Sequence, residues 1–396
     1  MKRAAAQAAA DAPFPGPVSL PDFAARVVAW QPHFGRSSLP WQGTRDPYLV
    51  WLSEVMLQQT QVATVLTYFP RFVARFPHVL ALAAASQDEV LGLWSGLGYY
   101  SRARNLHRCA QVVARQHGGQ FPASAEGLQT LPGIGRSTAA AIAAFCYGQR
   151  VAILDGNVKR VLTRLLGFDG DLALAANERA LWDLATGLLP PPDLLQAEPA
   201  AMARYTQGLM DLGARVCARR QPDCAACPAR GLCVAERTQS WDRYPVKTRK
   251  LKRSAQDLWL LLARTAGGAV WLQRRPERGI WAGLHCVPVF ESRAALLQAV
   301  AEPLRARLQD APSVRHSLTH KELLLTPLRL DVPAADAASP VRGPGQWLMA
   351  AQWQVLGLPA PIRLLLGDGT LPGPVPIATK PGKGRKTAKS TKKFDF

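Results

Sequence analysis

The chain lacks the long apolar runs of a membrane protein. No apolar stretch reaches 18 residues without a charge, which excludes an ordinary membrane-spanning helix. The alanine-rich start is interrupted by Gln7 and Asp11 and is too weakly apolar for a secretory signal peptide. No internal repeat is found. We therefore expect globular domains, and 396 residues are enough for two of them.

Acidic residues are scarce relative to basic ones. The chain has 28 Asp and Glu against 48 Lys and Arg, which gives a net charge of +20. The tail from Pro374 onward holds seven Lys and Arg and one Asp, so most of the excess lies elsewhere. A basic folded body is typical of proteins that bind a polyanion such as nucleic acid. A basic protein without such a partner is the alternative on charge alone.

Cysteine is also scarce, and its distribution is uneven. Three of the seven cysteines are scattered through apolar or helical segments, where we expect inert packing: Cys109, Cys146 and Cys286. The other four form a C-x6-C-x2-C-x5-C cluster: Cys217, Cys224, Cys227 and Cys233. An odd count with one tight cluster argues against a disulfide framework and predicts a metal site in a reducing, cytoplasmic compartment. Four thiolates suit a tetrahedral zinc or a four-iron cluster, and their chemistry does not separate the two.

Strand patterns are nearly absent before residue 237, where helical periodicity dominates, for example over 47–76. After a polar, basic stretch, "DLWLLLARTAGGAVWLQRR" has the apolar runs and Gly-Gly turn of a β-hairpin. The predicted fold class is therefore α+β multidomain. The predicted segments are a disordered arm (1–20), an all-α domain (21–237), a basic linker (238–254), a smaller α+β domain (255–370) and a basic disordered tail (371–396).

Two acidic residues stand in unusual contexts. On a continuous helix, Glu54, Gln58 and Gln61 fall at i, i+4 and i+7 and form one polar stripe among apolar residues. Such surroundings raise the pKa of a carboxyl and let it hold a proton near neutrality, although a structural glutamate is the alternative. Asp155 in "ILDGNVKR" follows an apolar, strand-like stub and precedes a helix, so it can be a simple N-cap.

The segment "LPGIGRSTAAAIAAF" over 131–145 predicts a helical hairpin. Gly133 and Gly135 allow a tight turn, and Ser137 or Thr138 can cap the following helix. Such a hairpin exposes backbone N–H groups that bind a phosphate without reading sequence. An ordinary helix–turn–helix is the alternative.

The motifs occur in one order: "SEVMLQQTQ", "LPGIGRSTA", "LDGNVKR" and then the four cysteines. With "GLGYYSRARNLH" and "MDLGARVC", this arrangement resembles the helix–hairpin–helix DNA glycosylases that carry a catalytic aspartate and an iron–sulfur loop, and among them the adenine DNA glycosylase family. The resemblance is dense over 22–237 and looser over 255–366. It implies a helix–hairpin–helix glycosylase domain with an iron–sulfur loop over 217–233, a Nudix-like second domain, one 4Fe–4S cluster on the four cysteines and no nucleotide cofactor.

The resemblance also assigns catalytic roles. It implies that Glu54 protonates the departing adenine, that Asp155 stabilises the positive sugar, and that Asn157 orients both Asp155 and the sugar. The N–glycosidic bond breaks through an oxocarbenium-like state, so the base needs a proton and the sugar needs an anion. The implied substrate is double-stranded DNA with adenine opposite 8-oxoguanine or guanine. We expect a base excision repair enzyme that acts as a monomer on DNA in the cytoplasm.

The remaining residues carried over from the family contact DNA. Gln58 and Tyr99 match wedge positions that fill the gap left by the flipped base. The hairpin residues Gly133, Gly135 and Ser137 match positions beside the lesion, and Lys159 lies near them. Lyase relatives have lysine where this chain has Ser137, so a monofunctional glycosylase is expected. The rival predictions are an endonuclease III-like lyase and a non-catalytic DNA damage-binding protein of the same fold.

The C-terminal region resembles a Nudix-type domain that reads 8-oxoguanine. The implied recognition residues are Thr319 and His320 in "RHSLTH", and Leu318 stands where many members have phenylalanine. Between Gly283 and Leu304 the chain has only Glu291 and Glu302, not a glutamate-rich metal box. Nucleotide pyrophosphatase activity is therefore not expected.

Overall fold

The computed structural model describes residues 20–248, 253–333 and 339–367. The predicted N-terminal arm up to residue 19 and the predicted basic tail lie outside these residues. The described chain divides into two compact units. One contains residues 20–248 with 274–285 and 349–359, and the other contains 253–273, 286–348 and 360–367. The domain boundaries inferred from sequence stay a prediction.

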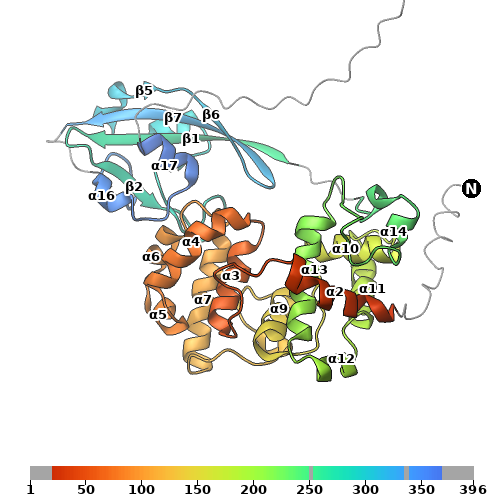
Figure 1. Ribbon diagram of the computed structural model, residues 1–396. Helices are drawn as coiled ribbons and strands as arrows, with labels where there is room; N and C mark the ends of the chain where they lie inside the picture. Colours follow the sequence, from red (N-terminus) through yellow and green to blue (C-terminus); the bar gives the residue numbers. More distant parts are fainter. Residues whose placement is uncertain (1–19, 249–252, 334–338, 368–396) are drawn as a thin grey trace, which may run out of the picture. The chain divides into compact units, whose positions relative to one another are not determined.

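The first unit is helical (Figure 1). Its first helices are α2 (Pro21–Phe34), α3 (Pro47–Leu57), α4 (Val62–Arg75), α5 (Val79–Ala84), α6 (Gln87–Leu93) and α7 (Tyr100–Gln116). They are followed by α8 (Ala125–Gln129), α9 (Arg136–Tyr147), α10 (Gly156–Leu166), α11 (Ala175–Gly187), α12 (Pro192–Ala197) and α13 (Ala201–Asp211). Short helices complete it: the π-helix η1 (Leu212–Val216), α14 (Val234–Arg237), η2 (Trp241–Arg243) and α16 (Ala350–Trp353). No helix of the described chain is both long and apolar enough to cross a membrane.

Helix α9 lies between two hydrophobic cores. One core is built mainly from α3 to α8, and Ile142 and Ala143 of α9 face it. The other is built from α2 and α10 to α13, and Ala140 and Ala144 face that core. Small side chains on both faces let the neighbouring helices approach closely. The alanine run that follows the glycine hairpin therefore joins the two halves of the unit.

The first helix of the chain packs against one of the last. Helices α2 and α13 are neighbours, and the ring of Phe23 meets the edge of Tyr205 with centroids 6.3 Å apart. A Cβ on Gly208 would lie 2.6 Å from the Val27 side chain, so the close approach requires glycine there. Just beyond α2, Arg36 donates through Nε to the buried Asp211 carboxylate at 2.6 Å. This ion pair fixes the chain where it leaves the second core toward α3.

The second unit is built on a mixed sheet with strand order β3-β2-β1-β7-β5. Its long strands β1 (Ser254–Thr265) and β7 (Lys321–Val332) pair in parallel from Ser254↔Lys321 to Thr265↔Val332. The other strands are β2 (Val270–Arg274), β3 (His285–Cys286), β4 (Val289–Phe290), β5 (Gln309–Asp310), β6 (Val314–Ser317) and β8 (Gln346–Leu348). Helical segments are α15 (Arg293–Ala299), η3 (Glu302–Arg307) and α17 (Ala360–Gly367). The predicted hairpin at the Gly-Gly turn is confirmed, since β1 and β2 pair antiparallel.

Candidate active site

Glu54 lies on a helix that is otherwise almost entirely buried. Helix α3 begins after Asp46, whose side chain caps the N–H of Tyr48 at 2.8 Å, and Pro47 occupies its first position. Nearly every residue from Tyr48 to Met56 is buried, because the helix packs against α4, α7 and α9. Glu54 is half-buried and has no hydrogen-bond partner among the residues that the structure describes. Burial of its carboxyl, and next the charge of Asp155, raises its pKa to about 7.

The predicted polar stripe is wrong, because the helix ends before it reaches Gln58 and Gln61. Helix α3 ends at Leu57, and α4 begins only at Val62. Between them Gln58 leaves the helical conformation with a ψ of 110°, Gln59 has a left-handed φ of 56°, and Gln61 has an extended backbone. Helical periodicity alone joined the two apolar segments, but the backbone turns between them. Glu54 is therefore a single acid in an apolar helix, and Gln58 lies in the turn that follows.

Asp155 is the N-cap of α10, as its sequence context allows. The residues before it, Ala152 to Leu154, are buried but form no strand, contrary to the predicted stub. Its Oδ1 accepts hydrogen bonds from the N–H groups of Asn157 at 2.9 Å and Val158 at 2.7 Å. Within the described chain Oδ2 accepts none. Capping therefore fixes one oxygen beside the positive end of a helix and leaves the other free to face a substrate.

The first turn of α9 connects the segments that carry the two acids. Ser137 Oγ accepts the Leu154 N–H at 3.2 Å, directly before Asp155. Gln58 Nε2 donates to Thr138 Oγ1 at 3.4 Å, directly after α3. The predicted capping role of these hydroxyl groups is wrong, since Gly135 is the N-cap of α9 and no side chain caps it. The two hydroxyls hold the neighbouring loops instead.

The hairpin before α9 has the open geometry of a phosphate site. Gly133 has a φ of +78°, and a Cβ there would lie 2.7 Å from Asn105 Cβ, so only glycine fits without a shift. A Cβ on Gly135 would meet nothing within 4 Å. The uncapped start of the 12-residue helix α9 therefore opens onto free space, where its N–H groups can bind an anion. Phosphate contact by this hairpin stays a prediction.

Tyr99 projects from the surface on a strained backbone. It is 45% exposed and has a left-handed φ of 48° immediately before α7. Large exposed aromatics with positive φ are uncommon and cluster where function requires them. Tyr100, in contrast, is half-buried and donates its hydroxyl to the Leu358 carbonyl at 2.8 Å. The wedge roles of Tyr99 and Gln58 stay predictions.

Lys159 and Asn157 lie on the first turns of α10 and have partners within the fold. The Lys159 ammonium donates to Glu178 of α11 at 2.6 Å. Asn157 Oδ1 accepts from Arg160 at 3.1 Å. A DNA contact by Lys159 requires its ammonium to leave or share Glu178, and that role stays a prediction.

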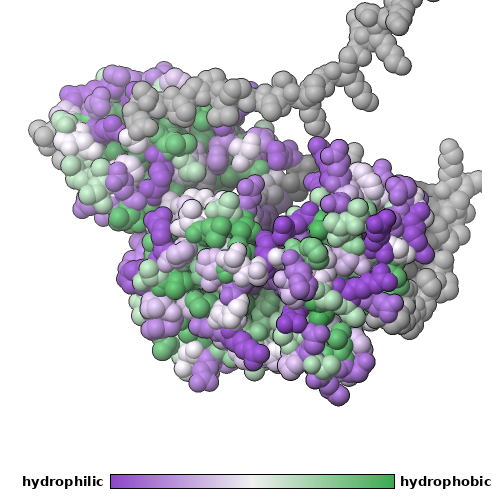
Figure 2. Space-filling model, in the orientation of Figure 1, coloured by the Kyte–Doolittle hydropathy of each residue, from purple (hydrophilic) through white to green (hydrophobic). Residues whose placement is uncertain are grey.

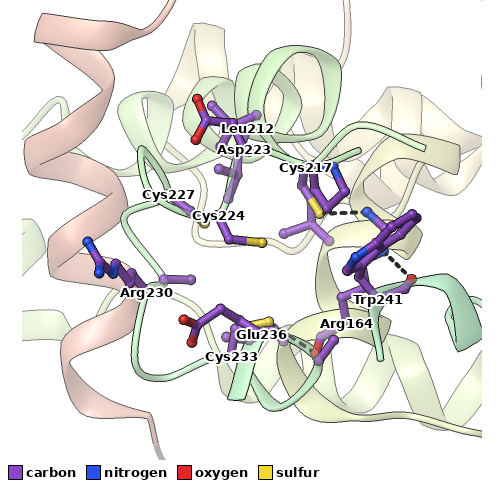
Figure 3. Close-up of a pocket in the computed structure, with 16 residues that line it drawn as sticks. Arg164, Leu212, Cys217, Asp223, Cys224, Cys227, Arg230, Cys233, Glu236 and Trp241 are labelled. Carbon is purple, nitrogen blue, oxygen red and sulfur yellow. Dashed lines mark hydrogen bonds between the residues drawn. The ribbon is translucent and has the colours of Figure 1, made fainter. Parts of the chain in front are cut away.

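The four clustered cysteines line one cavity of the helical unit. Figure 3 shows their side chains around a space bounded by α10, the π-helix and the loop that follows it, and none of them forms a disulfide. Most of the other lining is apolar and includes Val161, Leu165, Leu212 and Val216. Around α10 and α14, Figure 2 shows strongly hydrophilic side chains. The loop carries the exposed residues Arg215, Arg219, Arg220 and Arg230.

The chemistry of this cavity fits a cationic inorganic group. Burial raises the pKa of the Cys227 thiol to about 12 and also raises the pKa values of Cys224 and Cys233. Buried thiols become ligating thiolates only when a positive centre compensates their charge. Among the described side chains, no group of three or more His, Cys, Asp or Glu is gathered to hold a single metal ion. The sulfurs surround the cavity instead of converging on one point.

Two arginines of α10 bind this loop, and neither was among the predicted site residues. Arg160 donates to the carbonyls of Cys217 at 2.9 Å and Gly213 at 2.6 Å, as well as to Asn157. The buried Arg164 donates to Cys217 Sγ at 3.4 Å (Figure 3) and also to the Ala218 carbonyl at 2.7 Å. Their helical spacing of four residues was the available signal, because it places both on one face of α10.

The predicted 8-oxoguanine residues lie in the turn between β6 and β7. The Leu318 N–H donates to the Lys321 carbonyl at 2.7 Å and closes the turn. His320 is exposed, whereas Leu318 and Thr319 are half-buried. Beside the turn, Ser317 donates to Glu322 at 2.6 Å. Base recognition by Thr319 and His320 stays a prediction.

The chain matches two known families. Residues 52–185 match the HhH-GPD superfamily of base excision DNA repair proteins, and residues 258–368 match the NUDIX domain. The predicted fold class is confirmed. These matches and the helical fold of the first unit define a DNA glycosylase of the helix–hairpin–helix class, joined to a Nudix-like domain.

The similarity extends over most of the chain. It is 34% identical to the adenine DNA glycosylase of Buchnera aphidicola subsp. Acyrthosiphon pisum over 346 residues, which are 87% of this chain and 96% of that protein. It is 33% identical to the Homo sapiens adenine DNA glycosylase, over 82% of this chain and 70% of that protein. It is 40% identical to that of Mycobacterium tuberculosis, over 54% and 67% respectively. The chain belongs to the adenine DNA glycosylase family.

Proposed function

We propose that this enzyme hydrolyses the N-glycosidic bond of adenine opposite 8-oxoguanine or guanine in duplex DNA. The observation that carries the proposal is the pair formed by Glu54 and Asp155. One is a half-buried acid with a pKa of about 7, and its charged neighbour is an N-cap with one uncommitted oxygen. At neutral pH the first can give a proton and the second can face a developing cation.

The residues divide the reaction between them. Glu54 transfers its carboxyl proton to a ring nitrogen of the flipped adenine, and the bond from C1′ to the base breaks with its electron pair on the base. The carboxylate of Asp155 faces the positive sugar through Oδ2. Water adds to C1′ and gives up a proton that returns to Glu54. The products are free adenine and an abasic site.

The proposal is for a monofunctional glycosylase that acts as a monomer. A lyase needs an amine that attacks C1′, but the hairpin offers the hydroxyl of Ser137, which already accepts the Leu154 N–H. The ammonium of Lys159 is paired with Glu178. Both carboxyls, the hairpin and the cysteines come from one helical unit, so no second chain is needed. The inferred place of action is DNA in the cytoplasm.

The cysteine cavity is proposed to hold a 4Fe–4S cluster. Cys217, Cys224, Cys227 and Cys233 would be its ligands, and Arg164 would donate to the Cys217 sulfur. The cluster would compensate the charge of four thiolates in an apolar cavity and so stabilise the loop. Arg160 then connects the loop backbone to Asn157, next to the proposed catalytic aspartate. Thr319 and His320 are proposed to contact the opposite base.

The decisive experiment supplies purified protein with duplexes that carry A opposite 8-oxoguanine, G or T. We expect free adenine and alkali-labile sites from the first two and little from the A:T duplex. Strand breaks without alkali would favour the endonuclease III-like alternative, and tight binding without adenine release would leave only a damage-binding protein. Iron and sulfide analysis tests the cluster, and a zinc-containing protein without iron would contradict it.

A further inference from the structure

Arg102 is a buried arginine that the reaction above does not use. It lies in the first turn of α7, three residues after Tyr99, and is 9% exposed. No carboxylate of the described chain forms an ion pair with it. Burying a guanidinium without a carboxylate is costly unless hydrogen bonds satisfy its donors. Its bonding is therefore informative.

One nitrogen of the guanidinium holds the end of the helix that carries Glu54. Nη1 donates to the carbonyls of Val55 and Met56, each at 2.9 Å. These residues directly follow Glu54, and their carbonyls belong to the last turn of α3, where a helix has no partners of its own. A cation at this end also interacts favourably with the helix dipole. The guanidinium thus completes α3 next to the proposed acid.

The other terminal nitrogen holds two surface turns. Nη2 donates to Thr60 Oγ1 at 3.0 Å, in the turn after α3. It also donates to the carbonyls of Leu97 at 3.1 Å and Gly98 at 3.3 Å, in the turn before α7. The guanidinium lies over the rings of Trp94 and Tyr99, 5.3 and 5.4 Å from their centroids. One side chain therefore connects the acid-bearing helix to both turns.

Both turns contain a non-glycine residue with a positive φ. Gln59 has a φ of 56° and Tyr99 a φ of 48°. Such a backbone is unfavourable for a residue with a side chain and persists only when its surroundings hold it. The bonds of Arg102 reach the residue after Gln59 and the two residues before Tyr99. They are placed to hold these two strained turns in register.

We infer that Arg102 is a positioning residue that sets the exposed Tyr99 ring and the Glu54 helix in one fixed relation, so that filling the gap in the duplex and protonating the flipped adenine occur together. The inference rests on the proposed function. Arg102 touches neither substrate nor reacting atoms. It acts through the two turns and the end of α3.

The test compares Arg102→Met, which keeps an apolar stem but no donors, with Val113→Ala. Val113 is fully buried about three turns further along the same helix and reports general loss of packing. Amide hydrogen exchange of the DNA-free protein is measured at 55–60 and 96–100. We expect exchange in both segments to rise at least tenfold in Arg102→Met and to stay at the wild-type level there in Val113→Ala. Hydrogen exchange needs no enzymatic activity, so this measurement tests the positioning role of Arg102 separately from the proposed function.

The functional arm measures single-turnover adenine release in Arg102→Met, Tyr99→Ala and the double variant, all well below their melting temperatures. We expect about a hundredfold loss from Arg102→Met, with duplex affinity changed less than tenfold. In the double variant, Tyr99→Ala should cost much less than it does alone. Additive losses, unchanged exchange at the two turns, or an equal loss of rate in Val113→Ala would overturn the inference. A wild-type protein that releases no adenine would instead contradict the proposed function.

Discussion

Glu54 and Asp155 occupy opposite kinds of position on their helices. Glu54 lies within an apolar helix, where its carboxyl finds no hydrogen-bond donor in the described chain, and burial raises its pKa to about 7. Asp155 lies at the start of a helix and accepts two backbone N–H groups through Oδ1. The comparison shows how a fold can give two carboxyls different surroundings: burial raises the pKa of Glu54, whereas the start of a helix supplies Asp155 with two N–H donors.

The largest expected effect comes from removing the proton that Glu54 is proposed to give. Glu54→Gln keeps the shape of the side chain, so duplex binding should stay within a few-fold of wild type. Single-turnover adenine release should fall by about 10³- to 10⁴-fold, the range attributed to general acid catalysis. Binding is measured by fluorescence anisotropy and release by quench-flow. Substantial turnover by this variant would assign the acid role to another group.

A smaller effect is expected when the charge of Asp155 is removed but its cap is kept. Asn caps helices as well as Asp does. The unfolding free energy of Asp155→Asn should therefore stay within about 0.5 kcal/mol of the wild-type value. Its rate should fall by about 10²- to 10³-fold, because the sugar loses its anion. Asp155→Ala is the matched control, with a similar rate loss and an additional loss of about 1 kcal/mol in unfolding free energy. If Asp155→Asn kept its rate, the residue would be only a cap.

The elevated pKa of Glu54 predicts how rate and stability change with pH. Above pH 7 most of the acid loses its proton, so the rate of adenine release at pH 8 should be about a tenth of its value at low pH, where the acid is fully protonated. The folded protein holds this proton more tightly than the unfolded chain does, because the pKa of the carboxyl is near 4.5 in the unfolded chain. Unfolding free energy should therefore decline as pH rises from about 4.5 to 7, by at most about 3 kcal/mol. Urea titrations of wild type and Glu54→Gln isolate this contribution, which the variant should lack.

The smallest effect concerns the hydroxyl that supports the Asp155 loop. Ser137→Ala removes the acceptor of the Leu154 N–H and should lower unfolding free energy by about 1 kcal/mol. Asp155 keeps its own cap bonds, so the rate should fall only a few-fold. Thr138→Val is the matched control on the same turn, since it removes the weaker contact with Gln58 near the other acid. If Ser137→Ala and Thr138→Val changed the rate by the same factor and the unfolding free energy by the same amount, the two hydroxyls would not support the two loops separately.

Much of the site could be predicted from residue types and their spacing. The cysteine cluster, the glycine hairpin and the capping position of Asp155 are local patterns that are visible in short stretches of sequence. The prediction of a helix through Glu54 was correct up to Leu57, but the prediction that this helix continues through Gln58 and Gln61 was wrong. That break depends on a left-handed turn at Gln59, which glutamine adopts only when other parts of the fold hold it.

Other features needed the folded chain because they join residues far apart in sequence. In the sequence, Arg102 has the pattern of an ordinary polar residue of an amphipathic helix. In the structure its guanidinium donates hydrogen bonds to Val55, Met56 and Thr60. Ser137 was expected to cap its own helix, but its hydroxyl accepts a hydrogen bond 17 residues later. Side chains choose partners by proximity in space, which local periodicity does not encode.

By itself the sequence determined the chemistry available to this protein: two acids in contrasting local contexts, four clustered thiols, a glycine hairpin and an excess of basic charge. Only the tertiary structure decided which groups interact. It brought Asp155 close enough for its charge to act on Glu54. It also placed Glu54 among apolar side chains and gave Asp155 two backbone N–H donors. The physical reason is that a pKa, a cap and a strained turn depend on burial and distance, and these exist only once the helices pack.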